Sequence, residues 1–258
     1  MLGKVISVVL PKGGVGKTTS AISLAINFAE RNFNTLIIDL DPTASCSMTL
    51  GFDEENVIGD IFDVFSYSKN IQSVIHPTEI DKLSCIPQMK LNSIEEGRQA
   101  RLVSNNYLLK NVIDSIKADF DFIILDCPPY LFGTSFLALI ASDSVLVPIK
   151  TDEYSLDAVR TLGKRIEYIK MMYNKNLYVE GIFLTSYERN IKAAFRIKTE
   201  LYKQYPNLML NVTIPKDVNM MNVSFRKKPL SIVYPKSRAS IAYRELAEEI
   251  INKYSFIF

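Results

Sequence analysis

Lys12-Gly13-Gly14-Val15-Gly16-Lys17-Thr18-Thr19 directly follows an apolar run at residues 5–10. Such a run is typical of a buried strand, and the glycines after it allow a turn whose backbone N–H groups point into one small cavity. Residues 19–31 have a helical pattern, so the positive end of a helix is expected to face the same cavity. The stretch therefore predicts a site that binds the phosphates of a nucleotide.

The stretch departs from the usual phosphate-loop pattern G-x-x-x-x-G-K-[ST]. Pro11 stands where the first glycine is expected, and Lys12 places a second lysine inside the loop. In that pattern Lys17 binds the β and γ phosphates, and the hydroxyl of Thr18 ligates Mg²⁺. A glycine-rich turn with incidental lysines is the plainer alternative, but it does not explain why strand, loop, Lys-Thr pair and helix come in this order.

Apolar runs alternate with helical patterns along the chain. The runs are nearly continuous, as at 122–125, which is typical of strands covered by helices on both faces. The alternation predicts an α/β fold, a doubly wound, mostly parallel β-sheet in one domain over residues 1–258. Residues 52–98 are expected to hold short helices and surface loops. Strands are expected at 4–10, 35–39, 83–87, 121–126, 144–149, 179–184 and 208–213, and helices near 17–31, 99–118, 134–141, 155–173, 190–205 and 238–254.

The composition is that of a soluble globular protein, with 48% hydrophobic and 22% charged residues among 258. The chain has no run of about 18 apolar residues, so no membrane span is expected. A strand and the phosphate loop begin at once, which leaves no room for a signal peptide and favours a cytoplasmic location. Cys46, Cys85 and Cys127 are widely spaced and are expected as reduced thiols, and the single His76 as a loop residue.

Charge is unevenly distributed, although the net charge of the chain is only +2. Between residues 189 and 238 there are 11 Lys and Arg but only two acids, Glu200 and Asp217. The rest of the chain is therefore net negative. The asymmetry favours an anionic partner, nucleic acid above all, bound by the C-terminal part; a solvated basic surface is the plainer alternative.

Two further motifs lie at the carboxyl ends of predicted apolar strands. They are Asp39-Leu40-Asp41-Pro42 and Asp126-Cys127-Pro128-Pro129. Ligands of such sheets bind at the carboxyl ends of the strands, where the phosphate loop is also expected. An aspartate there matches the Walker B role of holding Mg²⁺ directly or through water. One such aspartate alone fits a helix cap equally well, but three motifs at one edge predict a joint nucleotide and Mg²⁺ site.

These three motifs together resemble those of the ParA/MinD family of deviant Walker ATPases. The resemblance continues at Ala141–Pro148, Ile214–Val218 and Pro235–Tyr243, so it spans nearly the whole chain. It is closest to the short ParA (Soj-like) branch, which segregates plasmids or chromosomes. The resemblance implies a nucleoid-associated ATPase that uses ATP and Mg²⁺, forms a homodimer when ATP binds, and is stimulated by a ParB-like centromere-binding protein.

The resemblance also implies roles for single residues. Lys12 corresponds to the signature lysine that reaches the phosphates of the second subunit, where it offsets charge as an arginine finger does. Asp41 corresponds to the carboxylate that orients the attacking water near the metal, and Asp39 lies in the same segment. The expected catalytic residues are Lys12, Lys17 and Asp41, and the expected Mg²⁺ ligands are Thr18 and Asp126. The expected nucleotide site comprises Lys12, Gly13, Gly14, Val15, Gly16, Lys17, Thr18 and Thr19, with Pro215 and Asp217 lining the adenine.

The chain departs from the family pattern at several positions. The family usually has Gln or Asn where Pro11 stands, Gln where Thr43 stands, and Ser where Tyr130 stands. A usual Glu is replaced by Asn222 and a usual Gly by Lys227. The first three changes concern the fine tuning of hydrolysis, whereas the last two make the surface more basic and favour DNA.

The leading hypothesis is a partitioning ATPase whose ATP-bound dimer binds DNA through phosphate contacts that carry no sequence information. The alternative is a MinD-like ATPase that cycles on a membrane through a C-terminal helix, although Glu248 and Glu249 suit an anionic bilayer poorly. No membrane partner is therefore expected. The candidate DNA contacts are Arg189, Lys192, Arg196, Lys216, Arg226, Lys227, Lys228, Lys236 and Arg238.

Overall fold

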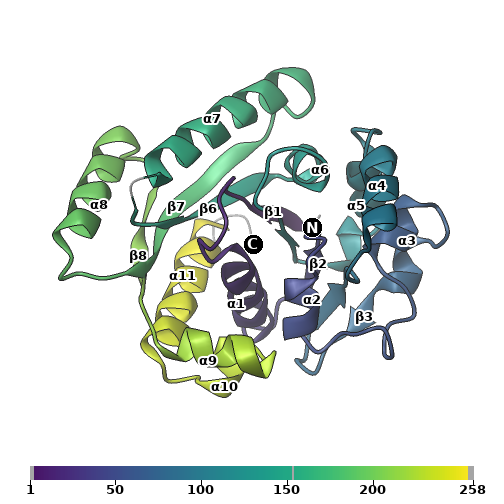
Figure 1. Ribbon diagram of the computed structural model, residues 1–258, viewed down its shortest axis with the longest axis horizontal. Helices are drawn as coiled ribbons and strands as arrows, with labels where there is room; N and C mark the ends of the chain where they lie inside the picture. Colours follow the sequence, from purple (N-terminus) through teal and green to yellow (C-terminus); the bar gives the residue numbers. More distant parts are fainter. Residues whose placement is uncertain (1–2, 153, 255–258) are drawn as a thin grey trace.

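The computed structural model describes residues 3–152 and 154–254, with all their side chains except those of residues 221 and 224–226. These residues form one eight-stranded sheet in the order β3-β4-β2-β5-β1-β6-β7-β8 (Figure 1). Within it, only the short β3 runs antiparallel to its neighbour, so the expected mostly parallel α/β sheet is confirmed. The strands are β1 (Lys4–Val8), β2 (Thr35–Asp39), β3 (His76–Pro77), β4 (Leu83–Ile86), β5 (Phe122–Asp126), β6 (Ser144–Lys150), β7 (Tyr178–Tyr187) and β8 (Met209–Pro215).

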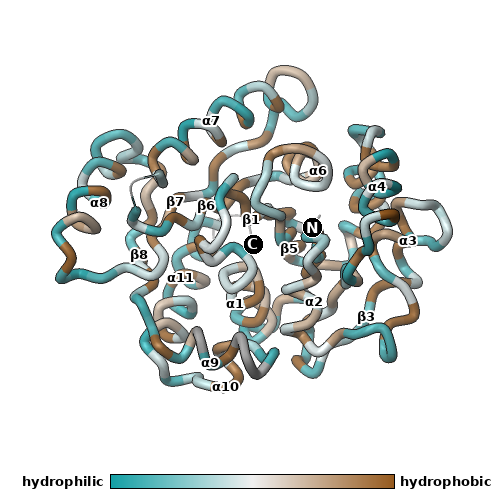
Figure 2. The backbone as a smooth tube through the Cα atoms, viewed as in Figure 1, coloured by the Kyte–Doolittle hydropathy of each residue, from teal (hydrophilic) through white to brown (hydrophobic). Residues whose placement is uncertain are grey.

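Helices cover both faces of the sheet (Figure 1). Along β5, Ile123 and Leu125 join one hydrophobic cluster and Phe122 and Ile124 join the other, because successive side chains of a strand point to opposite faces. Figure 2 shows the hydrophobic strands inside a more hydrophilic shell of helices. The helices are α1 (Lys17–Ala29), α2 (Ser45–Thr49), α3 (Ile61–Phe65), α4 (Ser93–Leu102), α5 (Leu108–Asp114), α6 (Thr134–Ala141), α7 (Ser155–Met172), α8 (Lys192–Gln204), α9 (Asn219–Arg226), α10 (Leu230–Val233) and α11 (Arg238–Tyr254), with the 3-10 helices η1 (Ile71–Val74) and η2 (Lys117–Asp119).

The three sequence motifs meet at one edge of the sheet. Val8 of β1 and Asp39 of β2 are both paired in register with Asp126 of β5. Because these strands are parallel, their carboxyl ends lie together, and the phosphate loop leaves β1 at the same place. The predicted convergence of the motifs is therefore confirmed.

Two local predictions are wrong. The helix expected at 99–118 is two helices, α4 and α5, separated at residues 103–107, where the side chain of Asn105 accepts the backbone N–H of Tyr107 at 3.2 Å. Such a local hydrogen bond competes with helix formation. His76 is not a loop residue: it is buried in β3 opposite Cys85, and its Nε2 lies 2.9 Å from the carbonyl oxygen of Gly59. The helices α9 and α10 were not expected.

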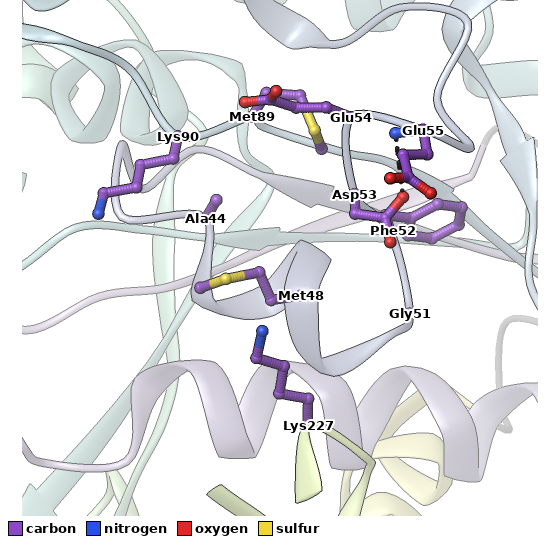
Figure 3. A pocket seen from close by; sticks show the side chains of 10 residues that line it. All are labelled: Ala44, Met48, Gly51, Phe52, Asp53, Glu54, Glu55, Met89, Lys90 and Lys227. Carbon is purple, nitrogen blue, oxygen red and sulfur yellow. Dashed lines mark hydrogen bonds between the residues drawn. The ribbon is translucent and has the colours of Figure 1, made fainter. Parts of the chain in front are cut away.

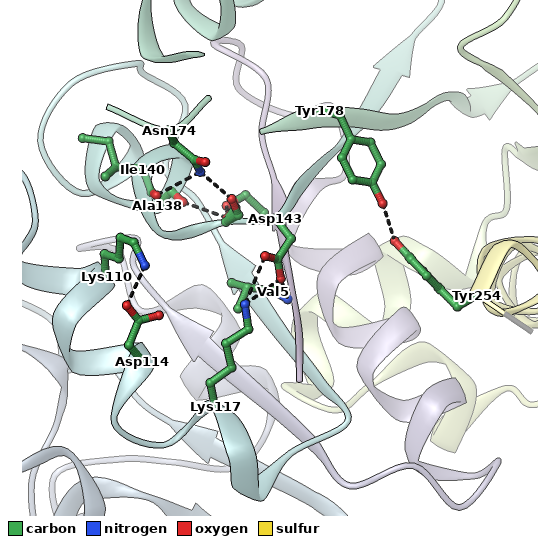
Figure 4. Close-up of polar contacts among 12 residues, drawn as sticks. Val5, Lys110, Asp114, Lys117, Ala138, Ile140, Asp143, Asn174, Tyr178 and Tyr254 are labelled. Carbon is green, nitrogen blue, oxygen red and sulfur yellow. Dashed lines mark hydrogen bonds and ion pairs between the residues drawn. The ribbon is translucent and has the colours of Figure 1, made fainter. Parts of the chain in front are cut away.

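Partly buried polar contacts join segments at the amino-terminal ends of the strands (Figure 4). Asp143 accepts the backbone N–H of Val5 at 2.8 Å and forms an ion pair with Lys117 at 2.9 Å. The amide of Asn174 donates to the carbonyl of Ser142 at 2.7 Å, which ties the end of α7 to the start of β6. Among the described residues, no helix combines the length and the apolar character needed to cross a membrane.

Gly181 in β7 offers a test of the packing between the neighbouring strands β7 and β8. A Cβ atom added there would lie 2.5 Å from side-chain atoms of Leu210, which is too close for any real contact. Gly181→Ala is expected to lower the free energy of unfolding by about 1–3 kcal/mol, as overpacking usually does. Urea unfolding in wild-type and Leu210→Ala backgrounds would check this, because the cost should largely vanish without the Leu210 side chain. An equal cost in both backgrounds would contradict this account.

Candidate nucleotide-binding site

The backbone of the phosphate loop, residues 11–16, requires glycine at two positions. Gly14 and Gly16 have φ angles of 69° and 84°, in the left-handed region that L side chains rarely adopt. Gly16 is also the N-terminal cap of α1, and none of the described side chains accepts a hydrogen bond from its first turn. These N–H groups are available to an anion, and the helix dipole favours a phosphate there.

Two buried hydroxyl groups brace this loop from behind. The hydroxyl of Thr185, near the end of β7, donates to the carbonyl of Val15 at 2.8 Å. On α11, the hydroxyl of Tyr243 lies 3.0 Å from that of Ser20 in the first turn of α1. The sequence-based prediction missed both roles. Tyr243 falls inside a motif that carries the family resemblance, whereas nothing in the local sequence distinguishes Thr185.

Lys17 is directed into the loop. Its Nζ donates to the backbone carbonyl of Lys12 at 2.9 Å, and only 7% of the residue is exposed. Burial lowers the pKa of Lys17, and the negative charge of Asp126 is the main opposing influence. A phosphate oxygen can take the place of that carbonyl as acceptor, which fits the predicted contact of Lys17 with the β and γ phosphates.

Asp39 holds together the segment that follows β2. Its fully buried carboxylate accepts the backbone N–H of Ser47 at 2.9 Å, the Ser47 hydroxyl at 2.7 Å and the backbone N–H of Asp41 at 3.0 Å. Burial raises the pKa of Asp39 to about 7, although these hydrogen bonds oppose the shift. Asp39 therefore fixes both the start of α2 and the backbone that carries Asp41.

Asp126 lies in register beside Asp39 but is not held by the chain in this way. Burial raises the pKa of Asp126 well above its ordinary value, the charge of Asp39 adds to the shift, and the nearby hydroxyl of Thr18 opposes it. Among the described residues, neither carboxylate oxygen has a partner with full hydrogen-bond geometry. A buried carboxylate in this situation is costly unless a cation neutralises it.

Asp126 and Thr18 therefore fit a Mg²⁺ ion. Their carboxylate and hydroxyl oxygens are the hard ligands that Mg²⁺ prefers, usually together with substrate phosphates and water. No cluster of three or more His, Cys, Asp or Glu that could hold a metal by itself occurs in the described part of the chain. The remaining ligands of a metal at this place would be water and the phosphates of a nucleotide.

Asp41 lies beside a cavity of about 380 Å³, enclosed by its own segment, the loop at 129–134 and α4. The residue is partly buried, and its Oδ1 accepts the backbone N–H of Thr43 at 2.9 Å. Asp41 thus borders a space large enough to hold water. The setting fits the predicted role of Asp41 in orienting an attacking water.

Lys12 is in a different setting from Lys17. Its Nζ forms an ion pair with Asp152 and lies 3.4 Å from the hydroxyl of Ser155 at the start of α7. The side chain of Lys12 is 20% exposed, and that of Asp152 is 38% exposed. The sequence-based prediction missed both partners, because the contacts join positions about 140 residues apart.

The two residues predicted to line the adenine are not equivalent. Pro215 borders a groove of about 640 Å³, together with Tyr187 and Val218. Asp217 is buried, and its carboxylate accepts the backbone N–H groups of Asn219 at 3.0 Å and Ala239 at 3.1 Å. Burial opposes ionisation of Asp217, but these N–H donors dominate and lower its pKa. Asp217 thus organises the turn that carries Pro215, and it is not among the residues that line the groove.

The basic residues predicted to contact DNA fall into separate groups. Arg189, Lys216 and Arg238 line the same groove as Pro215, and Lys192 and Arg196 are exposed on the adjoining first turns of α8. Within this group Lys216 forms an ion pair with Glu188 at 3.0 Å, so its charge is partly compensated.

The remaining basic residues lie elsewhere. Lys227 ends α9 and lines a second cavity of about 470 Å³ together with Met48 of α2 and Lys90 (Figure 3). Lys228 lines a smaller cavity that also contains Thr18 and Thr19 of α1. Lys236 is exposed before α11, and the side chain of Arg226 lies outside the described residues.

Comparison with known proteins places this chain in a family. A family model described as an AAA domain matches residues 3–179. The chromosome partitioning protein ParA of Myxococcus xanthus is 30% identical over 252 residues, which cover 98% of this chain and 89% of that protein. The sporulation initiation inhibitor protein Soj of Bacillus subtilis is 28% identical over 249 residues, 96% of this chain and 98% of that protein.

A solved structure supports the fold. The septum site-determining protein MinD of Pyrococcus horikoshii, in complex with Mg-ADP, superposes with a TM-score of 0.81 over 99% of this chain and 98% of that one, at 23% identity. The family model covers more than half of the chain, and the M. xanthus relative matches nearly all of it. The chain therefore belongs to the ParA/Soj group of P-loop ATPases.

Proposed function

We propose that this ParA-like ATPase partitions DNA: its ATP-bound dimer binds DNA non-specifically and hydrolyses ATP when a ParB-like protein stimulates it. The observation that carries the proposal is the contrast between the two lysines of one loop. Lys17 is buried on the phosphate side, whereas Lys12 is held near the surface by Asp152. One nucleotide site needs only the first lysine, and the second suits a triphosphate shared by two copies of the chain. The relatives named ParA and Soj support the partitioning role.

In the proposed reaction an oxygen of water bonds to the γ phosphorus while the bond to the β–γ bridging oxygen breaks, which leaves ADP and phosphate. Asp41 orients the water, and Lys17 with the N–H groups at the start of α1 stabilises the charge on the phosphate oxygens. When bound by Thr18 and Asp126, Mg²⁺ supplies further positive charge at the β and γ oxygens.

Dimer formation would require Lys12 to exchange one anionic partner for another. The ion pair with Asp152 is partly exposed on both sides, and such pairs contribute roughly 0–1 kcal/mol. The triphosphate held by a second copy carries more negative charge than one carboxylate. The exchange is therefore expected to be favourable with ATP and less favourable with ADP, because ADP lacks the γ phosphate.

The basic residues on the groove and on α8 support the DNA-binding part of the proposal. Lys192 and Arg196 are exposed on one side of α8, and Arg189 and Arg238 lie nearby on the groove. Exposed cations of this kind bind the phosphate backbone and carry no sequence information. A MinD-like membrane cycle has less support, because Leu246, Ala247 and Ile250 of α11 are buried against the core. The last residues of the predicted tail, 255–258, lie outside the described part of the chain.

Asp41→Ala is expected to lower the ATP turnover number by at least about 100-fold, because the attacking water loses the carboxylate that orients it. ATP and DNA binding should be retained, so the variant should accumulate as an ATP-loaded dimer on DNA. Phosphate release and DNA co-sedimentation measure the two effects. Asp157→Ala, on the exposed side of α7, is the matched control. Normal turnover by Asp41→Ala would contradict the assigned role.

Gly13→Leu is expected to leave ATP affinity nearly unchanged while abolishing dimer formation. A Cβ atom at Gly13 meets nothing within 4 Å in this chain, so the subunit itself accommodates a side chain, whereas a second copy facing the loop would not. Light scattering with a non-hydrolysable ATP analogue and Mg²⁺ gives the mass. Gly97→Leu is the control, since its Cβ is equally unobstructed on α4. A Gly13→Leu protein that dimerises normally would disprove this arrangement.

DNA binding by the ATP-loaded protein is expected to weaken steeply with salt on random-sequence duplexes. Each lost phosphate contact reduces the slope of log affinity against log salt by about 0.9. Arg189→Ala and Arg196→Ala should each show this reduction in fluorescence anisotropy titrations. Lys175→Ala, exposed next to Asn174 at the opposite edge of the sheet, should retain the wild-type slope. Binding that does not respond to salt would count against the proposed interface.

A further inference from the structure

The cavity beside Asp41 has an aromatic wall. Tyr130 and Phe132, from the loop that follows β5, line it together with Asp41 and with Glu96 and Gln99 of α4. The two rings are stacked, with centroids 4.4 Å apart and planes inclined by 15°. Phe132 is 68% exposed, so its ring contributes little to the core and its described ring contact is with Tyr130. Offset stacking of this kind limits the movement of both rings.

The wall and Asp41 belong to one rigid unit. The hydroxyl of Thr134, just after the aromatic pair, donates to the carbonyl of Leu40, the residue before Asp41, at 2.9 Å. The backbone N–H of Asp41 is fixed to the buried carboxylate of Asp39. Burial raises the pKa of Tyr130, and the charge of the Asp41 carboxylate adds to the shift.

The described contacts of Asp41 do not by themselves fix the direction of its side chain. Among the described residues only Oδ1 of this carboxylate accepts a hydrogen bond, from the backbone of Thr43, and Asp41 lines the cavity. An aspartate beside 380 Å³ of free space has several staggered rotamers open to it. The Tyr130 ring lines the same cavity and occupies part of the space into which the carboxylate would otherwise turn.

We propose that Tyr130, braced by Phe132, is a positioning residue that keeps the Asp41 carboxylate turned toward the attacking water. The inference rests on the proposed function, in which Asp41 orients that water. The contribution comes from the ring and not from the phenolic hydroxyl, because the wall acts by occupying space. Misplacing a catalytic group by about 1 Å costs up to roughly 100-fold in rate, so a partial loss of orientation is expected to cost about tenfold.

Steady-state ATP hydrolysis by the full chain with Mg²⁺ tests this. Tyr130→Ser is expected to lower kcat about tenfold and to leave KM for ATP within about twofold, because nucleotide binding does not use the wall. Tyr130→Phe, which keeps the ring, should retain wild-type kcat. Phe132→Ala, which removes the brace, should fall between them. Phe195→Ala removes an equally exposed ring from α8 and is the matched control.

A double-mutant cycle separates positioning from a general structural effect. In an Asp41→Ala background, Tyr130→Ser should cost nothing further, since there is no carboxylate left to orient. The inference is overturned if Tyr130→Ser leaves kcat unchanged or raises it, if Tyr130→Phe loses as much as Tyr130→Ser, or if the cost persists without Asp41. A wild-type chain that hydrolyses no ATP under any condition would instead refute the proposed function itself.

Discussion

The burial of two carboxylates side by side is the constraint on which the rest of the site depends. Asp39 and Asp126 end neighbouring strands in register, and both are fully buried. Two adjacent buried negative charges are unfavourable unless cations or hydrogen-bond donors compensate them. The chain supplies donors to Asp39 through Ser47 and the backbone of Asp41. It gives Asp126 no hydrogen-bond partner among the described residues, and the nearby charge of Lys17 compensates that carboxylate only in part.

The phosphate loop lies next to these carboxylates and has two lysines, Lys12 and Lys17, which differ in how deeply they are buried. Lys17 is buried, and burial lowers its pKa. Among the described residues, its ammonium group donates to a carbonyl inside the phosphate loop. Lys12 instead forms a partly exposed ion pair with Asp152 on α7. A buried lysine serves every bound nucleotide alike, whereas a surface lysine can respond to a second molecule. In the proposed function, Lys17 serves the nucleotide of its own subunit, and Lys12 serves the one bound by a second copy.

The sequence alone predicted those features whose causes are local. The apolar run before the glycines predicts β1, the alternation of runs and helical patterns predicts the parallel sheet, and aspartates at strand ends predict the common edge. The prediction failed where the role of a residue depends on a contact with a residue far away in the sequence. His76 is buried because it pairs with β4, and the roles of Asp152 and Thr185 depend on contacts that cross most of the chain. The break between α4 and α5 has a local cause, the hydrogen bond of Asn105, but the helical pattern of the surrounding residues led to the prediction of one continuous helix.

The contacts of the last helix, α11, bear on how this part of the chain unfolds locally. Along α11, the backbone of Ala239 is bound by Asp217, Tyr243 meets α1, Glu249 accepts the backbone N–H of Asn211 in β8, and Tyr254 reaches Glu180 in β7. A helix anchored at both ends and in the middle does not fray turn by turn but is released as a whole. Its amides are expected to exchange with solvent together with those of α1, as one cooperative unit. The C-terminal turns of α11 lie near the start of β7, on the same face of the sheet as α1, and they pack in one cluster with the helix that follows the phosphate loop.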